Sequence, residues 1–363
     1  MGFTLKNEER LAFELETLYL LNGYKKFKMR SFEEYSLYLN NSDFLISKNV
    51  ISFHGLDGRL LALRPDVTLS IIKNTKATET NTEKLFYDEK VYRESGQTRE
   101  FKEISQIGIE LIGKIDAYSY VETVTLAIQS LEIVSENYLL DLSDMNVVTS
   151  VINAFNVKSV IKEEIYKLLK SKNIDDFMKM AEKQNLSLKE INAFRTLASI
   201  SGIVSKEDLQ PLKISDESSK AVDEFINVLQ ILTAVNKDKN ISVNFSIAGN
   251  ADYYNGLIFS GYVLGIPKAV LTGGRYDKLL NKLGKKAGGV GFAVYLGEIE
   301  RYMEKESTVV DVLLLYNEKT DLIKLAKKIN ELKKQGLSVR VDTSIPLDFA
   351  YKTLINFDDK GAK

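Results

Sequence analysis

Alternating apolar and polar positions between residues 85 and 113 predict two antiparallel strands joined by a polar loop. Successive side chains of a strand point to opposite faces, so Gln106, Gly108 and Glu110 share one face of the second strand. Because the glycine between the amide and the carboxylate has no side chain, this face is predicted to hold an empty polar notch for a small ligand. An exposed sheet face with ordinary polar residues is the alternative interpretation.

The N-terminal pattern predicts a helix, a hairpin and a second helix. Apolar residues at near-helical spacing over residues 4–22 predict an amphipathic helix that is closed by a glycine. Its predicted apolar face comprises Leu11, Phe13, Leu15, Leu18 and Leu21. The GLDG sequence predicts a turn that leads into a strand. The RPDVT sequence then favours a helix start, which places Asp66 and Thr68 at the end of an element.

The middle of the chain is predicted to contain an inserted module of helices. A periodic helix over residues 116–134 and a strand over residues 138–144 precede this module. From about residue 147 to residue 235 the sequence is rich in lysine and glutamate and poor in glycine, which predicts helices with solvated charged faces. Strand-like sequence returns at residues 241–247, and Asn255-Gly256 predicts the turn of a hairpin.

Glycine clusters and a separate small domain are predicted towards the end of the chain. Residues 272–284 are interpreted as a loop entering a helix, and residues 288–303 as a buried strand entering a helix. Tight strand packing explains these glycines as well as nucleotide binding does. Residues 309–344 read as strand, helix and strand, which predicts a small α/β domain that is reduced in size.

Composition narrows the possible chemistry. The 363 residues predict two or three domains, and the 49 basic and 50 acidic residues produce no global field that would draw the chain to nucleic acid. The absence of cysteine excludes disulfides, thiolate metal sites and cysteine nucleophiles, and fits a reducing compartment. The single histidine, His54, excludes histidine-based zinc or triad chemistry. Without an apolar run of membrane-spanning length, we expect a cytoplasmic chain with no membrane partner.

Five ordered motifs resemble the histidyl-tRNA synthetase family. They are RPDVT, the hairpin from VYRE to ELIG, ADYYNGLIF, GGRYDKLL and GVGFAVYLGEIERY. The resemblance covers most of residues 1–305 and implies an α+β fold, a class II aminoacyl-tRNA synthetase-like antiparallel sheet flanked by helices. A helical insertion would occupy about residues 147–235 of this core. Residues 306–363 would form a reduced α/β domain that is similar to the first half of the family's anticodon-binding domain.

The resemblance also implies a pocket for histidine. Glu110 and Tyr254 would hold the imidazole, since a neutral imidazole offers one donor and one acceptor at opposite ring positions. The amino group would meet Thr68, Gln106 and Asp66, which stands where the family has glutamate. The implied histidine-binding residues are Asp66, Thr68, Arg93, Gln106, Glu110, Tyr253 and Tyr254.

The chain departs from the synthetase pattern where that family activates ATP. Arg93 matches an arginine that the family uses on the phosphate and the carboxylate. Gly249 stands where the family has an arginine beside the reacting carboxylate, and Glu298 stands where an arginine contacts ATP. Because activation needs positive charge around the phosphates, we expect no catalytic residues here. A proline of the first motif is also absent, with Arg30 near its place, which bears on an interface and not on the fold.

This combination resembles the regulatory subunits of ATP phosphoribosyltransferase in histidine biosynthesis. That resemblance implies a non-catalytic chain that activates a short catalytic subunit and binds histidine for allosteric feedback. It implies a homodimer within a hetero-oligomer, no cofactor, no metal and no productive tRNA binding. Two alternatives stay open, an active or divergent histidyl-tRNA synthetase and a free-standing histidine-binding sensor. The lysine-rich helix over residues 324–334 could contact RNA, although solvated lysines explain the same pattern.

Overall fold

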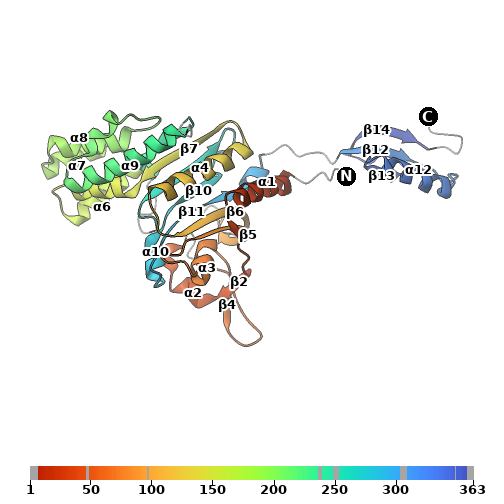
Figure 1. Cartoon of the computed structure of the whole chain (residues 1–363), viewed down its shortest axis with the longest axis horizontal. Helices are drawn as coiled ribbons and strands as arrows, with labels where there is room; N and C mark the ends of the chain where they lie inside the picture. Colours follow the sequence, from red (N-terminus) through yellow and green to blue (C-terminus); the bar gives the residue numbers. More distant parts are fainter. Residues whose placement is uncertain are drawn as a thin grey trace. The chain divides into compact units, whose positions relative to one another are not determined.

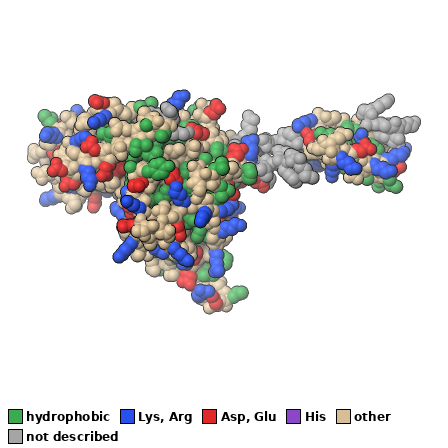
Figure 2. Space-filling view, in the orientation of Figure 1, with side chains coloured by type: hydrophobic (Ala, Val, Ile, Leu, Met, Phe, Trp, Pro, Cys, Tyr) green, Lys and Arg blue, Asp and Glu red, His purple; other side chains and the backbone are tan. Residues whose placement is uncertain are grey.

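The computed structural model divides into two compact units, residues 11–302 and residues 303–363 together with residues 1–10. The residues that the structure describes are 7–45, 49–95, 98–235, 239–247, 253–302, 309–347 and 349–357. Figure 2 shows acidic and basic side chains interspersed over the visible face of the larger unit, which fits the nearly balanced charge of the chain.

An eight-stranded sheet forms the centre of the larger unit (Figure 1). In spatial order its strands are β1 (Lys25–Lys26), β5 (Glu83–Glu94), β6 (Phe101–Gly113), β11 (Gly288–Tyr295), β10 (Leu271–Arg275), β9 (Leu257–Val263), β7 (Tyr138–Asp144) and β8 (Ile241–Val243). The interior pairs are antiparallel, whereas the edge pairs β1–β5 and β7–β8 are parallel. The predicted antiparallel sheet is therefore mixed at its edges, where long connections return the chain in the same direction.

Two helices cover the apolar face of this sheet. Helix α4 (Ala117–Val134) packs against β7, β9 and β11. Helix α1 (Asn7–Leu21) reaches the sheet through Tyr19, whose ring contacts Phe86 and Phe292 and whose hydroxyl hydrogen-bonds Ser130 Oγ over 3.0 Å. The buried residues of α1 that the structure describes are Leu11, Leu15 and Tyr19.

The predicted apolar face of α1 is partly wrong. Phe13 and Leu21 leave 65% and 82% of their surface exposed, and the exposed Leu20 lies next to Leu21 in the chain. The buried residues recur every four positions, because only that stripe of the helix faces the sheet. Phe13 and Leu21 therefore belong to an apolar surface that α1 turns away from its own core.

The β5–β6 hairpin is confirmed, with Tyr87 opposite Gly108 and Glu89 opposite Gln106. The empty notch that was predicted over Gly108 is wrong. A Cβ atom placed on Gly108 would lie 2.7 Å from the hydroxyl of Tyr87, so the phenol of the neighbouring strand fills that space. The glycine makes room for a protein side chain, and any ligand must bind beside it.

A smaller layer packs over the polar face of the large sheet. It consists of β2 (Phe32–Glu34), α2 (Tyr35–Leu39), a 3₁₀ turn η1 (Ser42–Phe44), β3 (Ser52–His54), β4 (Leu60–Leu63), α3 (Val67–Asn74) and α10 (Asp277–Lys282). The β3–β4 hairpin confirms the predicted turn, where Gly58 adopts a left-handed φ of 79°. Side chains of α2, α3, α10 and β5 share one hydrophobic core, so the large sheet and this layer pack as one body.

The helical module follows β7 (Figure 1). Its elements are α5 (Met145–Asn153), α6 (Ser159–Lys170), α7 (Ile174–Gln184), α8 (Leu188–Ser199), a 3₁₀ segment η2 (Glu207–Leu212) and α9 (Asp216–Ala234). Stacked rings of Phe177 and Phe194, 3.6 Å between centroids, help to form its own core. After β8, the short 3₁₀ turn η3 (Phe245–Ile247) packs against α6 and brings the module to the sheet.

Two predictions about the glycine-rich region are corrected. Asn255-Gly256 precedes β9 and is not the turn of the β9–β10 hairpin, which lies between residues 264 and 270. Gly273 and Gly274 belong to strand β10, not to a loop, since both pair with β9 and β11. Side chains are excluded at these positions because Cβ atoms there would strike the rings of Phe259 and Tyr254. The predicted strand and helix after them are present as β11 and α11 (Leu296–Glu300).

The smaller unit contains a parallel sheet of three strands in the order β13, β12, β14. Its elements are β12 (Val309–Leu315), α12 (Leu322–Lys334), β13 (Val339–Asp342) and β14 (Ala350–Asn356). The predicted strand, helix and strand are present as β12, α12 and β13, and β14 is a further strand that the pattern did not predict. Over the described residues of both units, the structure contains no helix long and apolar enough to cross a membrane.

Candidate functional site

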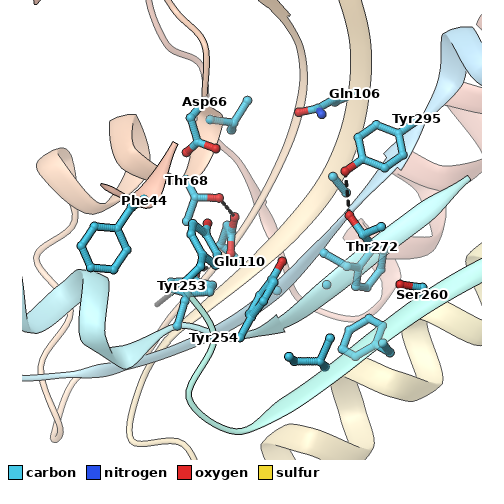
Figure 3. Close-up of a pocket in the computed structure, with 18 of the residues that line it drawn as sticks. Phe44, Asp66, Thr68, Gln106, Glu110, Tyr253, Tyr254, Ser260, Thr272 and Tyr295 are labelled. Atoms are coloured by element: carbon cyan, nitrogen blue, oxygen red, sulfur yellow. Dashed lines mark hydrogen bonds between the residues drawn. The ribbon is translucent and has the colours of Figure 1, made fainter. Parts of the chain in front are cut away.

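A cavity of about 350 Å³ lies on the polar face of the large sheet, between that sheet and the smaller layer (Figure 3). Strands β6, β9, β10 and β11 form its floor, and residues at the start of α3 form one wall. The predicted site residues that line it are Asp66, Thr68, Arg93, Gln106, Glu110, Tyr253 and Tyr254. The fold thus brings all seven together from four separate stretches of sequence.

Glu110 is the centre of the hydrogen bonding. The side chain is 2% exposed, Thr68 Oγ1 donates to its Oε1 over 2.7 Å, and the hydroxyl of Tyr276 donates to its Oε2. Burial raises the pKa of Glu110 to about 8, although both donors act in the opposite direction. At neutral pH the carboxyl group is therefore mostly protonated and can offer a ligand either a donor or, once ionised, an acceptor.

Asp66 and Arg93 form a buried pair at the start of α3. Asp66 caps that helix, since its Oδ1 accepts a hydrogen bond from the backbone N–H of Leu69 over 2.9 Å. Its Oδ2 lies 3.5 Å from Arg93 Nη2, and Arg93 Nε donates to the carbonyl of Pro65. Burial raises the pKa of Asp66, while the Arg93 guanidinium acts to lower it. The guanidinium thus holds the carboxylate in place at the cavity wall.

Gln106 brings an unsatisfied donor to the cavity. It is 2% exposed, and its Nε2 has no hydrogen-bond partner among the residues that the structure describes. A buried donor without a partner costs roughly 1–3 kcal/mol. In register Gln106 lies opposite Tyr295, whose hydroxyl bonds Thr272 Oγ1 over 2.6 Å (Figure 3). An acceptor on a ligand would satisfy the amide of Gln106.

Aromatic rings close the other side of the cavity. The rings of Tyr253 and Tyr254 meet edge to face with centroids 4.6 Å apart, and Tyr253 also approaches Phe44 and Tyr276. Such walls offer flat apolar contact to a planar ligand group. The site therefore combines a carboxyl group, a buried ion pair and aromatic faces around one small volume.

Sequence reasoning missed three tyrosines that line the cavity, Tyr87, Tyr276 and Tyr295. Their signal was present, because Tyr276 follows the glycine pair of GGRYD and Tyr295 follows the GFA motif. The glycines themselves also shape the site. A Cβ atom on Gly291 would lie 2.1 Å from Glu110 Oε2, and one on Gly274 would lie 2.7 Å from the ring of Tyr254.

The residues that mark the departure from the synthetase pattern are Glu298, Gly249 and Arg30. Glu298 in α11 forms ion pairs with Lys268 at 3.6 Å and Arg301 at 3.2 Å, and it does not line this cavity. Gly249 and its two neighbours in sequence lie outside the described residues. The backbone carbonyl of Arg30 accepts a hydrogen bond from Arg64.

The mixed sheet, its flanking helices and the small second unit define a class II aminoacyl-tRNA synthetase fold. Residues 4–299 match the family model described as histidyl-tRNA synthetase. The chain belongs to the histidyl-tRNA synthetase family and, within it, to the ATP phosphoribosyltransferase regulatory subunits.

Named relatives support this assignment. The ATP phosphoribosyltransferase regulatory subunit of Caldanaerobacter subterraneus is 32% identical over 336 residues, which cover 88% of this chain and 86% of that protein. The structure of an ATP phosphoribosyltransferase regulatory subunit/histidyl-tRNA synthetase from Bacillus halodurans has a TM-score of 0.79 and 20% identity, covering 98% of this chain and 96% of that chain. The ATP phosphoribosyl transferase (HisG:HisZ) complex from Thermotoga maritima has a TM-score of 0.63 and 16% identity, covering 81% of this chain and 98% of that chain. The structural likenesses show the fold, and the relatives confirm the predicted family.

Glu110 should make the stability of the protein depend on pH. The folded chain keeps the Glu110 proton up to about pH 8, whereas the unfolded chain loses it near 4.5, so the native state binds more protons in this window. The free energy of unfolding should therefore fall as the pH rises from about 4.5 to 8, by about 1.4 kcal/mol for each pH unit between the two pKa values. Glu110→Gln should remove this part of the slope in urea unfolding.

Burial also raises the pKa of Asp144, to about 6, so Asp144 adds to the pH dependence of the free energy of unfolding in wild type and in Glu110→Gln alike. The difference between these two proteins therefore reports on Glu110 alone. Glu163→Gln, on the exposed side of α6, is the matched control and should follow the wild type. Parallel pH profiles for wild type and Glu110→Gln would show that Glu110 is not held protonated.

Proposed function

We propose that this chain binds histidine in the cavity, activates a short ATP phosphoribosyltransferase catalytic subunit and relays feedback inhibition by histidine to it. Two findings from known proteins support this proposal. Its relatives are named ATP phosphoribosyltransferase regulatory subunits, and it shares its fold with a chain of the Thermotoga maritima complex. The observation that carries the choice of ligand is the buried carboxyl group of Glu110 beside aromatic walls.

Histidine matches the groups around the cavity one by one. The imidazole ring takes the place between Glu110 and Tyr254, with the carboxyl group as hydrogen-bond partner. The ligand ammonium meets the carboxylate of Asp66, and Thr68 and the Gln106 carbonyl oxygen offer further acceptors. Because each buried polar group gains a partner, an apolar amino acid of similar size would bind less tightly.

Feedback needs only a difference in affinity between two states. If histidine binds the inhibited assembly more tightly than the active one, a coupling free energy of about 1–3 kcal/mol is sufficient. We further propose that a second copy of the chain takes part in the assembly, since Phe13, Leu20 and Leu21 of α1 are exposed. We also propose that the chain divides into a synthetase-like core over residues 1–305 and a small domain over residues 306–363.

The test measures the ATP phosphoribosyltransferase rate of the short catalytic subunit from the same organism, without this chain, with it, and with added histidine. We expect the chain to raise the rate and histidine to lower it again. No change in rate and no complex would overturn the proposal. Histidine-dependent exchange of pyrophosphate into ATP would point to a synthetase instead, and histidine binding without any complex would point to a free-standing sensor.

A further inference from the structure

One residue of the helical module reaches the cavity. Lys170 is the last residue of α6 and lines the cavity, together with Ile247 of η3. Helix α6 is anchored by Ile165 and Leu169, which are 0% and 1% exposed, and it packs against η3. The exposed Lys170 follows directly after a buried anchor, so its position at the edge of the cavity is set by packing.

Lys170 is also the positively charged residue of the cavity lining that remains available to bind a ligand. The lining residues that the structure describes include two cations, and Arg93 is already bound to Asp66 and to the carbonyl of Pro65. The ammonium group of Lys170 makes no hydrogen bond or ion pair within the described parts of the chain. The buried donor of the cavity that lacks a partner is Gln106 Nε2, whereas the exposed Lys170 ammonium is open to solvent. A cation at the edge of the cavity and a buried amide without an acceptor favour a ligand that carries an anionic group.

We propose that Lys170 binds the carboxylate of the amino acid in the cavity, so that the helical module forms part of the ligand site. This inference rests on the proposed histidine binding. Asp66 and Glu110 account for the ammonium and the imidazole, and they leave the carboxylate as the remaining charged group of the ligand. The Lys170 ammonium and the Gln106 amide can both donate to it. The module thereby contributes to affinity for the free amino acid.

The test is calorimetric titration of the full-length chain with histidine and with histidinol, which keeps the imidazole and the amine but replaces the carboxylate by a hydroxymethyl group. Lys170→Met should weaken histidine binding about tenfold and leave histidinol binding within about twofold of wild type. Lys170→Arg keeps the charge and should stay within about threefold of wild type for both ligands. Lys167→Met, on the same turn of α6 but outside the cavity lining, is the matched control and should change neither affinity.

The outcomes separate this inference from the proposed function. If wild type binds histidine and Lys170→Met binds it equally well, the role of Lys170 is wrong while histidine binding stands. Equal weakening of histidine and histidinol would also overturn it, because the loss would not depend on the carboxylate. If wild type does not bind histidine, both the proposed function and this inference fall.

Discussion

Glu110→Ala is expected to abolish feedback by histidine while the complex with the catalytic subunit still forms. The substitution removes the partner of the imidazole and leaves the hydroxyls of Thr68 and Tyr276 without the acceptor that they now share. The loss of the hydrogen-bonding carboxyl group and the unsatisfied donors together correspond to about 3 kcal/mol or more, which is over 100-fold in histidine affinity. Because Glu110 is buried in the cavity, assembly surfaces should not change.

The measurement combines the inhibition curve of the assembled complex with its sedimentation profile. Glu103→Ala is the matched control, since Glu103 lies on the same strand β6 but is exposed and bonds Lys90 and Tyr92. Its inhibition curve should match that of wild type. Tyr254→Phe, which keeps the ring and removes only a hydroxyl, should weaken inhibition to a smaller degree. An unaltered inhibition curve for Glu110→Ala in an intact complex would place the histidine site elsewhere.

Arg64→Met is expected to destabilise the fold more than other substitutions of charged groups near the site. Arg64 is 1% exposed, and its guanidinium bonds Glu89 Oε2 at 2.9 Å, the carbonyl of Arg30 at 2.7 Å and the carbonyl of Lys90. The substitution leaves two backbone carbonyls and the partly exposed carboxylate of Glu89 without their donor, and losing a hydrogen bond to a charged group typically costs about 1.5–3 kcal/mol. The variant should unfold at a clearly lower urea concentration.

The effect should extend to the ligand site, because Arg64 directly precedes the Pro65-Asp66 segment that leads into α3. Histidine affinity should therefore fall together with stability. Arg59→Met is the matched control on the same hairpin, since Arg59 pairs with Asp57 and Glu34 at the surface and should unfold almost as wild type does. If Arg64→Met unfolds no earlier than Arg59→Met, the buried guanidinium is not what ties this segment to β5.

Local patterns were sufficient for most elements of this protein. Alternation over residues 85–113 predicted the β5–β6 hairpin. The RPDVT sequence predicted that α3 begins there, with Asp66 at the N-terminal end of the helix. These features depend on neighbours within one or two turns of chain, so periodicity and capping chemistry determine them. The chemical candidates Asp66, Gln106 and Glu110 were visible for the same reason: polar groups on a strand face and at a helix start stand out against an apolar pattern.

Tertiary structure decided which side chains share the cavity. Strand register set Tyr87 over Gly108, and the position of β10 beside β11 brought Tyr276 to Glu110, two relationships that no local pattern contains. The predicted face of α1 failed because periodicity shows that a helix has an apolar stripe but not which apolar residues meet the sheet. Lys170 lies 60 positions beyond Glu110 in sequence and reaches the same cavity through the packing of α6 on η3. Sequence alone determined most of the elements and the candidate chemical groups, whereas the contents of the site depend on contacts between segments that are distant in the chain.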